Sequence, residues 1–318
     1  MCEPANYNTS VSENPPHRAG FVALAGRPNA GKSTLINRLL GQKVAAVSFR
    51  PQTTRRQQLG ILTLEHAQII FIDTPGLHAA KHRLGEWLNA EALRALEECD
   101  LALLIFDISR PPEEADRLLA KTLQEHFKGQ KVVAAFNKLD ALAPQELEER
   151  VAQFETLLVE ADLPQADRVP ISAARGDQLD VLIQTLVESL PDSPPYFPSD
   201  QLTDLFERDL AADLIREAAL FHLRDEVPHA MAVRVDEYKE RQETGAYLAA
   251  TLFVERESQK GIVIGKGGAM LKEIGASARR EIETLTGRKV YLELRVKVRP
   301  NWRNDEEMLG RMGFQRNP

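Results

Sequence analysis

Residues 26–33 constrain the fold of this 318-residue chain more than any other feature. They read G-R-P-N-A-G-K-S, follow the apolar run Phe21–Ala25 and precede an amphipathic segment at 32–40. A glycine-rich turn between a buried strand and a helix can curl its amide N–H groups around phosphate oxygens, and the helix N-terminus adds partial positive charge. The sequence therefore predicts a phosphate-binding loop in an α/β domain. The alternative is a chance glycine-rich turn.

Two side chains of this predicted loop have distinct roles. Lys32 is expected to reach the β- and γ-phosphates of a bound nucleotide, and the Ser33 hydroxyl is expected to ligate Mg²⁺. The whole predicted loop comprises Gly26, Arg27, Pro28, Asn29, Ala30, Gly31, Lys32, Ser33 and Thr34.

Short apolar runs alternate with amphipathic segments through the first two thirds of the chain. Further strands are predicted at 68–72, 101–106, 131–136 and 168–171, and helices at 84–96, 112–127, 145–161 and 179–190. This alternation predicts a mostly parallel, doubly wound sheet with helices on both faces. Four prolines in Pro191–Pro198 cannot continue a helix and mark a domain boundary. We therefore divide the chain into a disordered leader (1–18), a first domain (19–190), a proline-rich linker (191–204) and a second domain with a C-terminal tail (205–318).

Composition excludes several classes of protein. The longest clean apolar run, Leu101–Phe106, is far shorter than the ~20 residues of a membrane span. Two cysteines, Cys2 and Cys99, exclude a disulfide framework and fit a reducing cytosol. The net charge of −7 argues against general nucleic-acid binding, but residues 256–303 carry 12 basic and 5 acidic residues. A local basic patch is therefore expected in the second domain.

Three polar motifs follow predicted strands. Ligands of open α/β sheets bind at the carboxyl ends of the strands, so the order of these motifs predicts a nucleotide site. The Asp140 carboxylate can accept hydrogen bonds from guanine N1–H and N2–H₂, a donor pair that adenine lacks. Asp73 can hold Mg²⁺ through water. The Gly76 N–H can bond the γ-phosphate. The motifs are Asp73-Thr74-Pro75-Gly76, Asn137-Lys138-Leu139-Asp140 and Ser172-Ala173-Ala174. Taken alone, the first motif could equally be an ordinary turn.

The second domain contains a G-x-x-G loop between apolar residues and a helix. Its predicted elements are a helix at 205–223, strands at 230–235 and 247–255, a helix at 269–285 and an alternating strand at 290–298. In KH modules such a loop clamps the backbone of about four nucleotides. The predicted RNA-binding residues are Gly265, Lys266, Gly267, Gly268, Arg279 and Arg280. The alternatives are a helix-starting turn without a ligand, and arginines that pair with neighbouring glutamates on a solvated helix face.

With its motifs in this order, the first domain resembles the translation-factor class of GTPases. The resemblance implies that Thr54 ligates Mg²⁺ in the GTP state, with Thr53 as the rival, and that both belong to a switch with Gly76. Leu77 stands where many such GTPases carry a water-positioning glutamine, so we expect slow intrinsic turnover. Asn29 matches the asparagine with which related GTPases hold K⁺; the alternative is a plain turn-forming residue.

A GTPase domain followed by a KH domain resembles the Era-type GTPases over nearly all of the chain after residue 18. The resemblance implies a small type II KH domain of α+β class, binding to 16S ribosomal RNA near its 3′ end and a role in 30S subunit assembly. It also implies a cytoplasmic monomer that associates peripherally with the inner membrane. Three alternatives are a P-loop kinase or ATPase, an RNA-binding scaffold with a purely structural nucleotide site, and a GTPase whose second domain binds protein.

Overall fold

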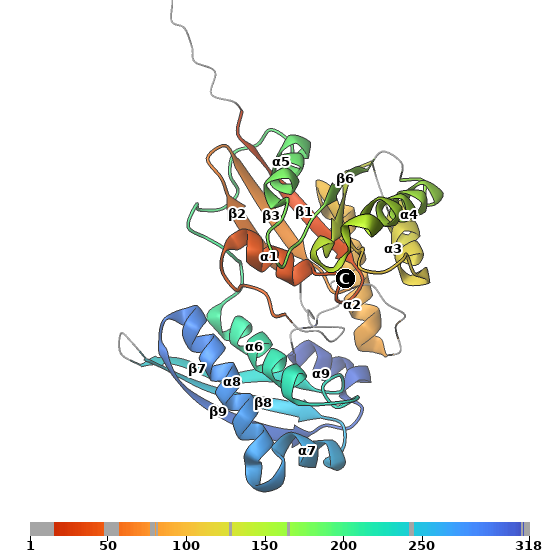
Figure 1. The fold of residues 1–318 in the computed structure, drawn as a ribbon. Helices are drawn as coiled ribbons and strands as arrows, with labels where there is room; N and C mark the ends of the chain where they lie inside the picture. The colour runs from red at the N-terminus through yellow and green to blue at the C-terminus, as the bar shows by residue number, and fades with distance from the viewer. Residues whose placement is uncertain are drawn as a thin grey trace, which may run out of the picture.

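A computed structural model describes residues 16–47, 57–76, 80, 82–126, 129–163, 166–241, 245–312 and 314. Thr53, Thr54, Leu77 and most of the predicted leader lie outside these residues. The chain forms two bodies, an upper one of red to green elements and a lower one of green to blue elements (Figure 1). None of the helices in the described ranges is long and apolar enough to cross a membrane.

The first body is the predicted doubly wound α/β domain. Its strands are β1 (Arg18–Gly26), β2 (Gln58–Thr63), β3 (Ala67–Asp73), β4 (Leu101–Asp107), β5 (Lys131–Asn137) and β6 (Asp167–Pro170), in the order β2-β3-β1-β4-β5-β6. Only β2 runs antiparallel to its neighbour. Its helices are α1 (Lys32–Leu40), α2 (Arg83–Glu98), α3 (Glu114–His126), α4 (Leu147–Glu160) and α5 (Leu179–Ser189). Strands β1 and β4 bury alternate residues against α1 and α5 on one face and against α2, α3 and α4 on the other.

Strand β2 was not among the predicted elements. It is the edge strand, and its residues Gln58–Thr63 lack the continuous apolar run that marks the central strands. The first strand also begins at Arg18, inside the predicted leader, and His17 Nδ1 lies 2.8 Å from Ser193 O. The ordered domain therefore starts slightly before residue 19.

The proline-rich segment 191–204 lies against the first domain. Gln68 of β3 accepts hydrogen bonds from the backbone N–H groups of Tyr196 (2.8 Å) and Phe197 (2.9 Å) and donates to Phe197 O (2.8 Å). Farther along, Ile61 N donates to Leu202 O at 2.9 Å, and Gly60 pairs with Thr203. The segment thus covers the open edge of β2, which would otherwise present unpaired backbone groups.

The second body contains a three-stranded sheet in the order β7-β8-β9. Strands β7 and β8 are antiparallel, whereas β8 and β9 are parallel. Helices α6 and α8 pack on one face of this sheet. The elements are α6 (Glu207–His222), β7 (Ala232–Arg241), β8 (Gly245–Val254), α7 (Glu257–Ile264), α8 (Ala269–Thr286), β9 (Lys289–Val298) and α9 (Glu306–Arg311). This is the predicted α+β arrangement.

Helices α7 and α9 were missed in the sequence. Helix α7 contains Gly261 and the run Ile262-Val263-Ile264, residue types that favour strands. Its start is fixed instead by Gln259, whose Oε1 accepts hydrogen bonds from the N–H groups of Glu255 and Arg256. Side-chain capping therefore outweighs the local propensity here.

Among the described residues, the two bodies contact each other through an apolar cluster and through ion pairs. Leu84 and Leu88 of α2 pack in one apolar cluster with Phe253 of β8, the buried Trp302 and Leu309 of α9. On the other side of α1, Lys43 reaches two carboxylates of the second body. Both contacts involve segments that lead to or from the predicted nucleotide site.

Candidate functional site: a nucleotide pocket and an RNA-binding groove

The predicted phosphate loop has the geometry of an anion-binding turn. Gly31, the N-cap of α1, has φ 106° and ψ 16°, in the left-handed region that favours glycine. A Cβ added at Gly31 would lie 2.1 Å from Asn137 Nδ2, so a side chain there would collide with the motif at residues 137–140. Asn137 Nδ2 also donates to Ala30 O at 2.8 Å. The P-loop and the Asn137 motif are thus held together directly. Asn29 has φ 66°, a backbone conformation that asparagine tolerates.

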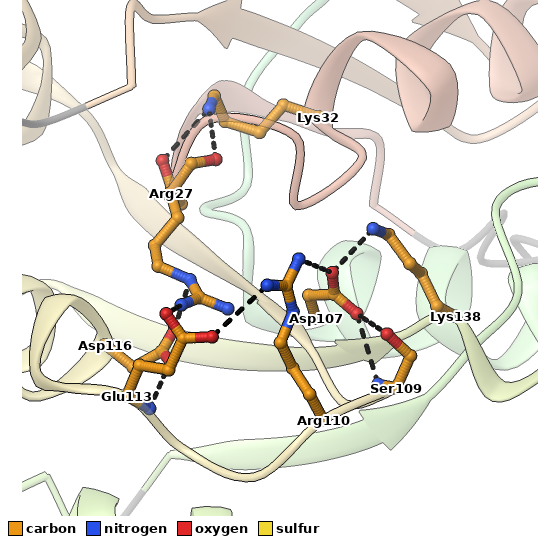
Figure 2. Close-up of polar contacts among 9 residues, drawn as sticks. Arg27, Lys32, Asp107, Ser109, Arg110, Glu113, Asp116 and Lys138 are labelled. Atoms are coloured by element: carbon orange, nitrogen blue, oxygen red, sulfur yellow. Dashed lines mark hydrogen bonds and ion pairs between the residues drawn. The ribbon is translucent and has the colours of Figure 1, made fainter. Parts of the chain in front are cut away.

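Lys32, Ser33 and Asp73 converge as predicted. Lys32 Nζ is buried and donates to Gly26 O (3.0 Å) and Arg27 O (3.2 Å) (Figure 2). Burial lowers the pKa of Lys32, and the nearby Asp73 opposes that shift. The Ser33 hydroxyl donates to Asp73 Oδ2 at 3.0 Å. A hydroxyl and a carboxylate this close form a hard-oxygen donor set suited to Mg²⁺.

The Asp73–Gly76 motif lies against the P-loop. The Thr74 hydroxyl donates to Leu24 O at 2.6 Å, which ties the motif to β1. A Cβ at Gly76 would lie 2.9 Å from Pro28 N, so only glycine permits this approach. The Gly76 backbone is therefore beside the loop that would hold phosphates, which is the position its predicted sensing role requires. Leu77, the next residue, lies outside the described residues.

The two motifs that were predicted to read the base meet at the ends of β5 and β6. Asn137 Oδ1 accepts a hydrogen bond from Ala173 N at 2.9 Å, and the Ser172 hydroxyl donates to Asp140 Oδ1 at 2.5 Å. Leu139 N donates to Ile171 O at 3.1 Å. These bonds orient the Asp140 carboxylate and place the Ser172–Ala174 turn next to it. The structure thus brings together predicted residues from distant parts of the chain.

Asp107, at the end of β4, was not identified from the sequence. Its Oδ2 lies 2.6 Å from Lys138 Nζ, and its Oδ1 accepts from the Ser109 N–H and hydroxyl (Figure 2). Burial raises the pKa of Asp107, but the bonds from Lys138 and Ser109 outweigh it and hold the pKa below the usual value. The sequence did contain a signal for Asp107, because it follows an apolar run in the same way as Asp73, which ends β3.

Arg27 also has a role that the sequence did not indicate. Its guanidinium forms ion pairs with Glu113 (2.7 Å) and with the buried Asp116 of α3 (2.9 Å). The Arg27 side chain is nine-tenths buried, and its carbonyl accepts from Lys32. The predicted nucleotide contact of Arg27 is therefore limited to its backbone, while its side chain braces the P-loop against α3.

The G-x-x-G loop of the second domain is open to solvent at its tip. Gly265, Gly267 and Gly268 have φ values of 72°, 62° and 83°, and a Cβ at Gly267 or Gly268 would meet no atom within 4 Å. A groove of about 390 Å³ begins at this loop and runs between α8 and β9. The groove is lined by Gly268, Leu271, Lys272, Gly275, Ala276, Arg279, Leu292 and Leu294.

Only one of the two predicted arginines lines this groove. Arg279 does, whereas Arg280 is exposed and its Nη2 lies 3.5 Å from Ser277 Oγ. Arg280 is not among the groove-lining residues, and its predicted RNA contact stays a prediction. Lys272, two helical turns before Arg279 on the same face of α8, lines the groove and was overlooked. The spacing of these two cations along a helix was the signal that could have found it.

Comparison with known proteins matches a family to each of the two bodies. Residues 21–138 match the family described as 50S ribosome-binding GTPase, and residues 226–303 match the KH domain family. The GTPase Era of Geobacter metallireducens is 46% identical over 305 residues, which cover 96% of this chain and 100% of the relative. The GTPase Era of Mycolicibacterium smegmatis is 46% identical over 299 residues, which cover 93% and 99%.

A solved structure matches over both bodies. The crystal structure of Era in complex with MgGDPNP and nucleotides 1506–1542 of 16S ribosomal RNA has a TM-score of 0.88 and 38% identity, covering 94% of this chain and 100% of that chain. The P-loop, the guanine-type motif and the G-x-x-G groove thus occur together here on one architecture. On these grounds the chain belongs to the Era family of GTPases.

Proposed function

We propose that this GTPase is a Mg²⁺-dependent switch that binds 16S ribosomal RNA near its 3′ end and assists assembly of the 30S subunit. The observation that carries the proposal is the presence, in one chain, of a braced guanine-type pocket and an open G-x-x-G groove. The MgGDPNP and 16S RNA bound by the related Era structure agree with these two sites.

In the nucleotide pocket, Lys32 would contact the β- and γ-phosphates, and Ser33 and Asp73 would hold Mg²⁺. Thr54, or its rival Thr53, would complete the Mg²⁺ shell in the GTP state; both lie outside the described residues. Asp140, oriented by Ser172, would accept the two guanine donors. Competition between GTP and ATP tests this assignment: a preference for ATP would favour the P-loop kinase or ATPase alternative.

Hydrolysis is proposed to be slow in the isolated protein. Leucine at position 77 cannot hydrogen-bond an attacking water, so another group or a partner must position that water. Asn29 beside the phosphates is the proposed K⁺ ligand, and a cation there would stabilise charge developing in the transition state. Phosphate release measured in K⁺ and in Na⁺ tests this role. Equal rates in both salts would leave Asn29 as a turn-forming residue, and a fast rate would refute slow turnover.

The G-x-x-G groove is the proposed RNA site. Replacing Gly267 and Gly268 with Asp would place carboxylates where phosphates approach, and it should abolish RNA binding. Gly287→Asp is the matched control, because Gly287 also has a positive φ (67°) and open space around its Cα. If the double variant still binds RNA, the alternative of a protein-binding second domain becomes the better one.

Nucleotide state is proposed to set the affinity for RNA. Ordering of the switch residues Thr53, Thr54 and Gly76 by GTP would change how the second domain sits on the first. RNA affinity should therefore differ between GDP and a non-hydrolysable GTP analogue; equal affinities would refute the switch. A monomeric state, a cytoplasmic location and peripheral inner-membrane association remain predictions of the family resemblance, and fractionation of cells tests the last two.

A further inference from the structure

A row of stacked side chains crosses the sheet of the second domain on the face opposite α6 and α8. Tyr247 of β8 and Tyr291 of β9 are in register, with ring centroids 5.9 Å apart and an interplanar angle of 18°. The Arg241 guanidinium carbon lies 4.9 Å from the Tyr247 ring centroid. We call Arg241, Tyr247 and Tyr291 the aromatic row.

The free end of the aromatic row is at the edge of the sheet. Strand β9 is an edge strand, and Tyr291 is 66% exposed although it is a large aromatic residue. Its neighbour Val290 is buried in the core, so the strand alternation directs Tyr291 outward. One face of the Tyr291 ring is occupied by Tyr247, and the other lies towards the open edge of the sheet.

The row adjoins the end of the proposed RNA groove. Helix α8 runs from the G-x-x-G loop to Thr286 and returns as β9, so the part of the groove farthest from the loop is near the start of β9. Leu292, the residue after Tyr291, lines the groove together with Arg279. A strand of RNA that leaves the groove past Leu292 would therefore reach the Tyr291 ring.

We propose that the aromatic row is a second RNA contact, in which Tyr291 stacks on a base beyond the nucleotides held in the groove. This proposal rests on the RNA-binding function proposed above. Stacking on an exposed aromatic ring is tolerant of base identity, because every base has a π face. A KH groove holds about four nucleotides, so a longer RNA needs a further surface.

The charges around the row favour nucleic acid over an apolar protein partner. Lys289, two residues before Tyr291 and on the same face of β9, has a side chain that is 89% exposed. Arg241 closes the other end of the row, and Arg295 and Lys297 lie farther along the same face of β9. Glu293 lies on this face too; it accepts a hydrogen bond from the Tyr247 hydroxyl (2.8 Å) and pairs with Arg295 (2.6 Å), so its charge is compensated. Cations beside an aromatic platform are suited to a phosphate backbone and its bases.

The test compares two lengths of RNA. The probes are nucleotides 1506–1542 of 16S RNA and the shortest sub-fragment of it that wild-type protein still binds. Tyr291→Ala should weaken binding of the long RNA by about 5- to 100-fold and leave the short RNA unchanged, whereas Tyr291→Phe should retain both affinities. Tyr196→Ala, at an exposed tyrosine of the first domain's linker (51% exposed), is the matched control.

Other outcomes would overturn the proposal, refute the proposed function or assign this face to another partner. Unchanged binding of the long RNA by Tyr291→Ala overturns the proposal, and so does equal weakening of both RNAs. Failure of wild-type protein to bind either RNA refutes the proposed function itself. A concentration-dependent dimer that Tyr291→Ala abolishes, with RNA binding intact, would assign the face to a second copy. Photocrosslinking of a 4-thiouridine-labelled long RNA to the peptide containing Tyr291 gives an independent readout on unmutated protein.

Discussion

At the scale of single residues, the proposed nucleotide site includes charged side chains that hold the predicted motifs in place. Asp107 holds the Lys138 ammonium at 2.6 Å, and Arg27 fixes the P-loop through Glu113 and Asp116. These pairs bring the motif residues into one orientation before any ligand binds. Preorganisation of this kind lowers the ordering cost of binding.

The Asp107→Asn variant tests the brace on Lys138. A neutral amide cannot form an ion pair with the ammonium and holds it more weakly, so Lys138 should move more freely and GDP should dissociate about tenfold faster. Stopped-flow release of a fluorescent GDP measures this rate. Arg110→Ala is the control, since Arg110 is a more distant and exposed partner of Asp107 (3.5 Å), and its loss should change the rate less than twofold. An unchanged GDP release rate in Asp107→Asn would show that Lys138 needs no brace.

The pKa of Cys99 gives a second prediction at this scale. Burial raises the pKa of its thiol to about 11, and its Sγ lies 3.3 Å from Leu96 O. At pH 8 only about one thiol in a thousand would be ionised, so Cys99 should be inert to a thiol reagent. In a Cys2→Ser background, native protein should not react and unfolded protein should release one equivalent of dye. Rapid labelling of the native protein would contradict the burial.

At the scale of elements, segment 191–204 behaves as part of the first domain and not as a free linker. Prolines keep it extended, and β2 and β3 provide its hydrogen-bond partners. The chain therefore enters the second domain from a position that is fixed at the β2 edge of the first domain's sheet.

Gln68→Ala tests that attachment. The substitution leaves the N–H groups of Tyr196 and Phe197 without their acceptor, which should cost about 1 to 3 kcal/mol in the free energy of unfolding. Limited proteolysis should then cut within 191–204, where wild-type protein resists. Gln184→Ala removes an exposed pair with Glu188 on α5 and should change neither property. Equal resistance of the Gln68→Ala variant would mean that proline stiffness alone protects the segment.

At the scale of the whole molecule, Lys43 connects the nucleotide domain to the second domain. It follows α1, which carries Lys32 and Ser33, and its Nζ lies 2.8 Å from both Glu217 of α6 and Glu281 of α8. Burial raises the pKa of Glu217, while Lys43 opposes that shift. Since α8 also lines the proposed RNA groove, these ion pairs join the segment after the P-loop helix to the helix of the groove.

Lys43→Met should break this link. We expect the free energy of unfolding to fall by about 1 to 2 kcal/mol at neutral pH, because Glu217 keeps its charge without its partner. A carboxyl whose folded-state pKa is raised destabilises the protein when it ionises, so the difference from wild type should shrink as pH falls towards 5. Chemical denaturation at several pH values measures this difference in the free energy of unfolding. Adding Glu217→Gln should restore part of the lost stability.

The same variant should also reduce the nucleotide dependence of RNA binding. We expect the ratio of RNA affinities with GDP and with a GTP analogue to move towards one. Lys121→Ala, at an exposed lysine of α3, is the control for loss of positive charge. If the Lys43→Met variant keeps the wild-type ratio of RNA affinities, the apolar cluster around Trp302 becomes the better candidate for the route of coupling.

The sequence by itself determined the motifs and most of the helices and strands. The buried central strands and the P-loop were predictable because each depends on a local pattern: a continuous apolar run, or glycines before a helix. The position of the guanine motif followed from the rule that ligands meet the carboxyl ends of parallel strands. Edge strand β2 and helix α7 were missed because their local patterns are weak or favour another structure.

Only the tertiary structure decided which charged side chains face the ligands and which serve as braces. Arg27 and Arg280 look in the sequence like ligand-binding cations, yet Arg27 pairs with Glu113 and Asp116, and Arg280 is exposed and does not line the groove. Asp107, Lys43 and Tyr291 acquire their proposed roles from neighbours more than 30 residues away in the chain. Long-range pairing of this kind depends on how packed elements are placed, and a local sequence pattern does not encode that placement.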